Sequence, residues 1–202
     1  MSARMRAGNT ALMVLGGLLG VGILAVILVF SYSNSYVAMD QEVKGAWAQV
    51  DNQLKRRADL IPNLVESVKG YASHEKEIFV RIAEARARIG SNASPKDKME
   101  ANNQLTQATT QLIAVAEAAN PDLKAAPLFR QLMDELAGTE NRLAVERQRY
   151  NEVVQKFNTA IAQVPGRFFA GALGYQPATY FEVPAAEKTA PKVSFETGAA
   201  KS

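Results

Sequence analysis

The sequence predicts an all-α protein in which an N-terminal transmembrane helix is followed by an antiparallel, up-and-down four-helix bundle with long helices. Three observations lead to this fold class. Residues 11–30 form an uncharged apolar run of twenty residues. Beyond residue 36, apolar side chains recur every three or four positions, which is the helical period, and no strand-like alternation of useful length occurs. Long helices joined by short loops pack antiparallel, so a bundle is expected.

The composition is that of a folded chain and excludes several kinds of site. The chain has 202 residues, of which 48% are apolar and 21% charged, and it contains no cysteine. Disulfides, thiolate metal sites and cysteine nucleophiles are therefore excluded. Arg4 and Arg6 precede the apolar run, which leaves 23 − 2 = 21 basic and 20 acidic residues for the rest. This nearly neutral remainder lacks the positive field of a nucleic-acid binder, so no nucleic-acid partner is expected.

The apolar run, "ALMVLGGLLGVGILAVILVF", has the length of a membrane span. At 1.5 Å per residue, twenty residues extend roughly 30 Å, the thickness of a bilayer's hydrocarbon core. A cleaved signal peptide is the alternative, but its apolar region is shorter and ends in a small-x-small site, whereas "SYSNSY" follows here. A lipid-embedded, single-pass anchor is the favoured interpretation.

The orientation of the anchor follows from its flanking basic residues. Arg4 and Arg6 lie before the span, and no Lys or Arg follows it until Lys44. Residues 1–10 are therefore expected in the cytoplasm of a bacterium and the soluble domain on the periplasmic side of the cytoplasmic membrane, with a cytoplasmic domain as the alternative. Gly16 and Gly20 form a G-x-x-x-G pair that favours self-association in lipid, although glycine is common in membrane helices in any case.

Residues 31–165 are expected to form the bundle, with helical arms at about 36–58, 60–89, 95–119 and 128–163. The first apolar face carries Val43, Trp47, Val50, Leu54, Ala58, Ile61, Val65 and Val68. Pro62 interrupts this pattern. Either it kinks a continuous helix, or a new helix begins after an Asp59 cap and holds the proline in its first turn; both alternatives stay open.

The later arms have clearer ends. Ser94, Pro95 and Asp97 form an S-x-x-D capping box at the start of one helix, and Asn120-Pro121 ends it. The next pattern runs for about 36 residues until Pro165-Gly166, a rod of roughly 54 Å. Its expected inner face is Phe129, Leu132, Leu136, Thr139, Leu143, Arg147, Tyr150, Val154, Phe157, Ile161 and Val164.

The C-terminal part changes character. Residues 166–183 are rich in aromatic residues and glycine, whereas 184–202 resemble a flexible tail. The first segment either caps the open end of the bundle, which is favoured, or docks on the bilayer interface. The candidate residues for these contacts are Phe168, Phe169, Tyr175, Tyr180 and Phe181.

The basic cluster Lys55, Arg56 and Arg57 is interleaved with carboxylates. Asp51 and Asp59 stand at ion-pair spacing from Lys55 and Arg56. A solvated, self-paired helix face is therefore favoured over contact with an acidic partner or lipid headgroups, and both are favoured over nucleic acid.

No catalytic or metal-binding pattern is present. His74 is the one histidine, and Ile78 stands where a zinc peptidase helix would need a second. Neither a nucleophile-elbow serine motif nor a phosphate-binding loop occurs. No enzyme activity, metal or cofactor is expected, and hydrolysis by carboxylates alone is kept only as a remote hypothesis.

Several strings resemble the LemA family of bacterial membrane proteins. They are "QVDNQLKRRADLIPNLVESVKGYASHEKEIF", "ENRLAVERQRYNEVVQKFNTAI", "PATYF" and "APKVSF", within residues 36–195. The resemblance implies a four-helix up-and-down bundle on a single-pass anchor, without known enzymatic activity. It also implies a poorly defined role; magnetosome-forming bacteria use related proteins in membrane biogenesis.

Polar and aromatic residues within these strings are candidates for helix register or for an interaction with another subunit. Register is the favoured role, in which aromatics enter the core and asparagines bond neighbouring helices. These candidates are Lys55, Arg56, Arg57, Asn63, Tyr150, Asn151, Phe157 and Asn158. The leading hypothesis is a homo-oligomeric scaffold that organises protein or lipid at the membrane. The alternative is an adaptor for one membrane protein, such as a membrane protease.

Overall fold

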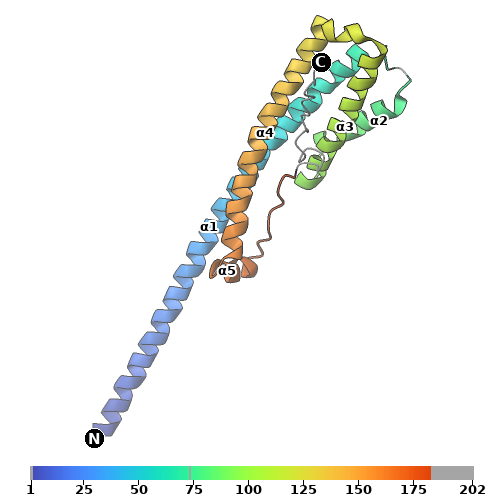
Figure 1. The fold of residues 1–202 in the computed structure, drawn as a ribbon. Helices are drawn as coiled ribbons and strands as arrows, with labels where there is room; N and C mark the ends of the chain where they lie inside the picture. The colour runs from blue at the N-terminus through green and yellow to red at the C-terminus, as the bar shows by residue number, and fades with distance from the viewer. Residues whose placement is uncertain (1, 73, 183–202) are drawn as a thin grey trace, which may run out of the picture. The chain divides into compact units, whose positions relative to one another are not determined.

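The computed structural model describes residues 2–72 and 74–182, and over these residues the chain is all-α, without a strand (Figure 1). The elements are α1 (Ser2–Val68), α2 (Lys76–Gly90), α3 (Pro95–Ala119), the 3-10 turn η1 (Pro121–Ala125), α4 (Pro127–Ala162) and α5 (Gly166–Ala172). The predicted all-α class is confirmed for this part of the chain. The expected tail, 184–202, lies outside the described residues.

α1 corrects the prediction for the first half of the chain. It runs without interruption from Ser2 to Val68 and contains Pro62 in its interior. The alternative of a new helix beginning near residue 60 is therefore wrong, and the helical division falls between Val68 and Lys76 instead. Proline removes one backbone hydrogen bond, at a cost of about 3 kcal/mol. Burial of the neighbouring Ile61 and Leu64 on the same helix helps to offset that cost.

The predicted bounds of the two later helices agree with the structure. α3 begins after the Ser94 cap, whose Oγ accepts a hydrogen bond from the Asp97 backbone N–H at 3.2 Å. It ends at the Asn120 cap. α4 starts and stops within one residue of the predicted 128–163. Of its eleven expected inner residues all are buried except Arg147, which is partly exposed, and Val164, which lies beyond the end of α4.

The chain divides into two compact units. The first consists of Met1–Pro62 and Arg130–Tyr180. Within it α1 and α4 lie side by side in opposite directions: Trp47 contacts Tyr150 edge-to-face at 5.6 Å, and Arg57 pairs with Glu140. Ten residues forward along α1 thus correspond to ten residues back along α4. The two helices are therefore antiparallel. Their apolar faces share the helical period, so they can stay in contact over several turns.

The second unit includes Asn63–Phe129 and is built around α2 and α3, which pack against each other. Arg81 donates to Gln111 at 2.7 Å and Arg88 to Gln104 at 3.0 Å, so this pair is also antiparallel. The buried residues of α2 are Ile78, Ile82, Ala85 and Ile89; those of α3 include Ala101, Leu105, Ala108, Leu112 and Ala116. Small and branched apolar residues thus alternate through this core and allow the two helices to approach closely.

Candidate functional site

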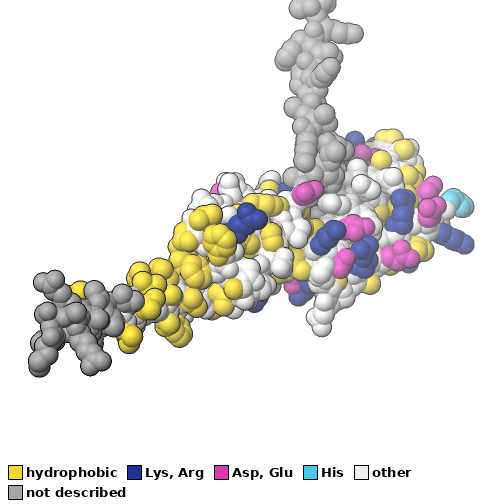
Figure 2. Space-filling view, turned by 90° about the horizontal axis from the view of Figure 1, so that it is seen from below, with side chains coloured by type: hydrophobic (Ala, Val, Ile, Leu, Met, Phe, Trp, Pro, Cys, Tyr) yellow, Lys and Arg dark blue, Asp and Glu magenta, His cyan; other side chains and the backbone are white. Residues whose placement is uncertain are grey.

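The N-terminal part of α1 is apolar and exposed. Among the described residues, α1 alone is long and apolar enough to cross a membrane, and its most apolar stretch is entirely unburied. Figure 2 shows hydrophobic side chains covering this stretch. Exposed Leu, Ile, Val and Phe side chains continue as far as Phe30. So large an apolar surface is a hallmark of contact with lipid or another protein.

Gly16 and Gly20 lie on this exposed stretch. A β-carbon at either position would meet no atom within 4 Å. Because they are four residues apart, both lie on the same side of α1. The chain therefore presents them on a bare helical face, and a role in self-association stays a prediction.

An aromatic cluster begins directly after the apolar stretch, where α1 meets α5 and the end of α4. The Tyr32 ring stacks on Phe169 with centroids 4.8 Å apart, and Tyr36 meets Tyr175 edge-to-face at 5.5 Å. Phe157 also contacts Tyr175, at 6.0 Å. Ile161 and Ala170 complete the buried centre of this cluster. Two residues of the predicted aromatic segment, Phe169 and Tyr175, are thus packed against the long helices.

Gly166 is what allows α5 to reach α1. A β-carbon at this position would collide with the Tyr36 hydroxyl and would lie 2.7 Å from the Ala160 carbonyl oxygen. Tyr36 is only 1% exposed, and its hydroxyl has no hydrogen-bond partner among the described residues. Burial, together with the neighbouring Tyr32, raises the pKa of the Tyr36 phenol above its usual value of 10.0. The buried hydroxyl, which lacks a partner in the described part of the chain, therefore acts as a packing group.

The remaining aromatic candidates do not share this environment. The Phe168 side chain is 71% exposed and Tyr180 is exposed as well, whereas Phe181, in the second unit, is 2% exposed. The five residues proposed as one cap or lipid contact are therefore divided between packed and solvent-facing positions. Sequence composition groups these residues, but only the fold separates the packed rings from the exposed ones.

The segment after α5 is fastened to α4 by side-chain hydrogen bonds. The Asn158 amide makes a reciprocal pair with Ala178: Nδ2 donates to the carbonyl oxygen at 2.9 Å, and Oδ1 accepts from the backbone N–H at 2.8 Å. The Tyr150 hydroxyl donates to the Thr179 carbonyl oxygen at 2.8 Å. Burial raises the pKa of Tyr150 above its usual value of 10.0. Asn158 thus bonds an extended segment, not a neighbouring helix as expected.

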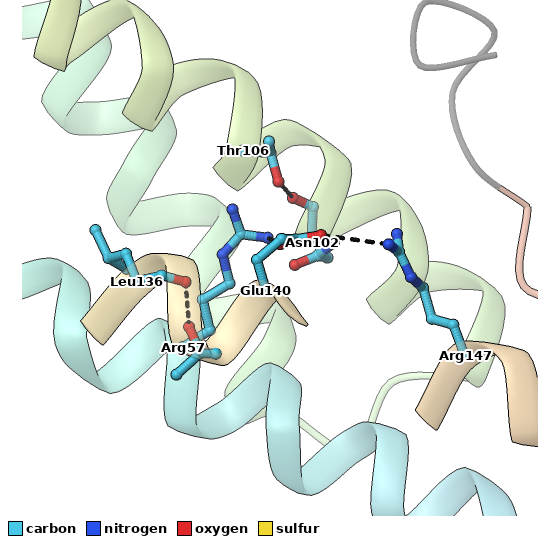
Figure 3. Close-up of polar contacts among 7 residues, drawn as sticks. Arg57, Asn102, Thr106, Leu136, Glu140 and Arg147 are labelled. Atoms are coloured by element: carbon cyan, nitrogen blue, oxygen red, sulfur yellow. Dashed lines mark hydrogen bonds and ion pairs between the residues drawn. The ribbon is translucent and has the colours of Figure 1, made fainter. Parts of the chain in front are cut away.

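A charged cluster links α1 and α4 further along the first unit (Figure 3). One Glu140 carboxylate faces two guanidinium groups: Arg57 Nη1 lies 2.5 Å from Oε2, and Arg147 Nη2 lies 3.3 Å from Oε1. The Arg57 side chain is 11% exposed, and that of Glu140 is 37% exposed. Arg57 therefore differs from Lys55 and Arg56: it pairs with Glu140 between α1 and α4, whereas they are exposed.

The other candidates lie on the surface. Lys55 is exposed and pairs with Asp51 at 2.8 Å, as predicted, and Arg56 and Asn63 are exposed too. His74 is exposed on the turn before α2. Within the described ranges, no three His, Cys, Asp or Glu side chains are grouped so as to hold a metal ion. Asn151 is half-buried on α4.

A shallow pocket of about 350 Å³ lies between α4, α5 and the segment that follows. Asn158, Arg167 and Tyr175 are the polar residues of its lining, and the rest are apolar or glycine. A largely apolar lining with one guanidinium has the composition that suits an amphipathic group.

Sequence reasoning missed three residues on which these contacts depend: Tyr36, Glu140 and Gly166. In the sequence, Gly166 belongs to the Pro165-Gly166 helix stop, and Glu140 begins one of the strings that resemble the LemA family. A signal for Gly166 existed, since glycine at the start of a short helix often permits a close backbone approach. Its partner could not have been named, because the contact joins residues distant in the sequence.

Comparison with known proteins identifies a family and several named relatives. The model of the LemA family matches residues 46–195. MamQ 2, a magnetosome protein of Paramagnetospirillum magneticum, is 24% identical over 198 residues, covering 85% of this chain and 72% of its own. The magnetosome protein MamQ of Magnetospirillum gryphiswaldense is 23% identical over 211 residues, which cover 91% of this chain and 77% of that protein. Protein LemA of Metamycoplasma hominis is 24% identical over 145 residues, which cover 71% of this chain and 65% of that protein. Because the family model covers most of the chain, including α2, α3, α4 and α5, the protein belongs to the LemA family.

Proposed function

We propose that the protein is a non-enzymatic, membrane-anchored helical scaffold that self-associates and organises protein or lipid at the bacterial cytoplasmic membrane. The observation that carries this proposal is the continuity of α1. Its exposed apolar part and its packed part are one helix, without a linker between them. A continuous helix transmits position and orientation from the membrane to the packed helices, as a scaffold requires. Relatives named as magnetosome proteins are compatible with this role.

The same continuity favours an anchor over a cleaved signal. Cleavage just after Phe30 would leave Tyr32 and Tyr36 in a frayed helix end, although both are needed in the aromatic cluster. In membranes washed with alkaline carbonate, the full chain should stay in the pellet at its full length. Release into the supernatant, or a mature chain beginning near residue 31, would refute the anchor.

For the helical domain we propose an up-and-down four-helix bundle in which the packed part of α1 joins α2, α3 and α4. Each unit by itself contains one antiparallel helix pair, and two such pairs form a bundle when their apolar faces meet. The chain has no cysteine, so spin labels can be placed at will. Labels at exposed Lys55 and Gln107 should give one narrow distance distribution by pulsed electron resonance; a broad distribution would contradict a fixed bundle.

For orientation we propose a periplasmic domain, on the strength of Arg4 and Arg6 ahead of the span. Protease added to intact spheroplasts should remove the C-terminal tail, detected by blotting. Survival of the tail in intact spheroplasts, with its loss after lysis, would place the domain in the cytoplasm and reverse this part of the proposal.

Self-association is proposed to use the face of Gly16 and Gly20. Replacing both with leucine should reduce chemical cross-linking between copies of the protein in membranes, because bulky side chains prevent the two helices from approaching closely. Gly22→Leu is the matched control, since it lies about 200° around the helix from Gly20 and has equally open surroundings. Unchanged cross-linking in the double variant would reject this face. A single stoichiometric partner recovered by proximity labelling, with little self-labelling, would favour an adaptor instead.

A further inference from the structure

The position of α5 relative to the apolar run points to a second membrane contact. Phe30 is the last residue of the twenty-residue run, and Tyr32 and Tyr36 follow it by two and six residues on the same helix. At 1.5 Å per residue, they lie about 3 Å and 9 Å beyond the end of the run. Because the run matches the hydrocarbon thickness, there is little freedom to slide it. The headgroup layer adds about 5–7 Å on each side, so Tyr32 falls within this layer and Tyr36 lies at its outer edge.

α5 packs directly on these two tyrosines. Phe169 stacks on Tyr32, and Gly166 contacts Tyr36, both within the first unit. The short helix is therefore held at the depth of the headgroup layer by contacts with α1 and not by its own affinity for lipid. Its exposed surface meets whatever occupies that layer.

The exposed surface of α5 is apolar where a soluble protein would be polar. Gly166 and Ala170 are buried, whereas Phe168, about 200° around the helix from Gly166, is 71% exposed. Val164 before the helix is 72% exposed and Leu173 after it 41% exposed. The exposed Arg167 accompanies them. Aromatic and aliphatic side chains beside a basic residue are the composition of interfacial membrane contacts.

We propose that Val164, Phe168 and Leu173, together with Arg167, form an interfacial foot that inserts its apolar side chains among the lipids of the membrane that α1 crosses. This inference rests on the proposed membrane anchor. It divides the aromatic segment by role: Phe169 and Tyr175 pack on the helices, and Phe168 enters the lipid interface. The foot gives the first unit a second contact with the bilayer and so fixes the tilt of α1, which a spanning helix alone leaves variable.

The absence of native cysteine provides the test. A nitroxide label on Phe168→Cys in the full chain, reconstituted in phosphatidylcholine–phosphatidylglycerol vesicles, reports its depth through relaxation by oxygen and by a water-soluble nickel chelate. Val26→Cys, in the exposed apolar run, is the lipid reference. Val145→Cys, exposed on α4 and about 26 Å along that helix from its last residue, Ala162, is the water reference.

The label at Phe168 should show an oxygen-to-nickel accessibility ratio several-fold above that of Val145 and below that of Val26. Labels at Val164→Cys and Leu173→Cys should agree. If Val26 is lipid-exposed but all three labels match Val145, the foot is refuted while the anchor stands. If Val26 itself is accessible to nickel, the anchor fails first. Shielding from both reagents, with spin–spin broadening, would show that a second copy covers this surface and would overturn the proposal.

Discussion

Gly166 packs directly against the hydroxyl group of Tyr36, so closely that a β-carbon at position 166 would overlap it. The same β-carbon would lie 2.7 Å from the Ala160 carbonyl oxygen, which belongs to the backbone of α4 and cannot move aside easily. This contact joins α1, α4 and α5 at one point.

Gly166→Ala should therefore destabilise the first unit. Overpacking of this kind costs about 1–3 kcal/mol, because α5 has to shift away from Tyr36. Gly171→Ala, on the same short helix, is the control: its β-carbon would meet nothing within 4 Å, so it should be neutral or slightly stabilising. Thermal unfolding followed by circular dichroism in detergent would compare the two. Equal effects would mean that the close approach to Tyr36 does not constrain α5.

Tyr36→Phe should be neutral or stabilising, since it removes a buried hydroxyl without a hydrogen-bond partner among the described residues. Combined with Gly166→Ala it should recover part of the lost stability. Recovery should be incomplete, because the collision with the Ala160 carbonyl remains. Additive effects in the double variant would show that the two residues are not in contact.

Asn158→Ala should release the segment after α5 from α4, because it removes both hydrogen bonds to Ala178. A loss of about 1–3 kcal/mol is expected from the two bonds and the unpaired backbone groups. Amide hydrogen exchange over residues 173–180 should accelerate. Gln155→Ala, an exposed change on the same helix, should leave exchange unaltered. Normal protection in the Asn158 variant would mean that Tyr150 alone holds the segment.

Glu140→Ala should leave two guanidinium groups close together without their shared carboxylate. Repulsion and the partial burial of Arg57 predict a loss of about 1–3 kcal/mol in the free energy of unfolding, discounted because Glu140 is partly exposed. Glu146→Ala is the comparison, since its pair with the largely exposed Arg149 should contribute less than about 1 kcal/mol. Chemical denaturation would measure both, and a smaller loss at Glu140 than at Glu146 would contradict the assignment.

The Ser94–Asp97 cap predicts a dependence of stability on acid. The hydrogen bond from the Ser94 hydroxyl, at 2.6 Å, is the main cause that lowers the pKa of Asp97 below its usual 3.8. A lowered folded-state pKa means that the ionised group contributes stability above pH 3.8, and that this contribution disappears as the pH falls through the folded-state value. The stability difference between wild type and Asp97→Asn should therefore shrink below pH 3.8. A difference independent of pH would argue against the ionised cap.

Prediction from sequence worked best where the signal is local. The bounds of α3 follow from Ser94, Pro95 and Asn120, because capping depends on residues within one turn of the helix end. The buried face of α4 follows from its spacing, since a helix repeats every 3.6 residues. Pro62 left two alternatives open, a kinked continuous helix or a new helix, for the same reason. Its local effect favours a break, but burial of Ile61 and Leu64 within the folded chain keeps α1 continuous to Val68.

By itself, the sequence determined that this protein is helical, that it begins with a long uncharged apolar run, and that it resembles the LemA family. Only the tertiary structure decided that Asn158 bonds the Ala178 backbone, that Glu140 joins Arg57 to Arg147, and that Phe168 faces outward while Phe169 packs on Tyr32. The physical reason is the separation along the sequence between the residues that interact. Helical period and caps depend on residues close in the sequence, whereas these contacts join segments that only folding brings together. The residues next to a side chain in the sequence therefore do not identify its distant partner.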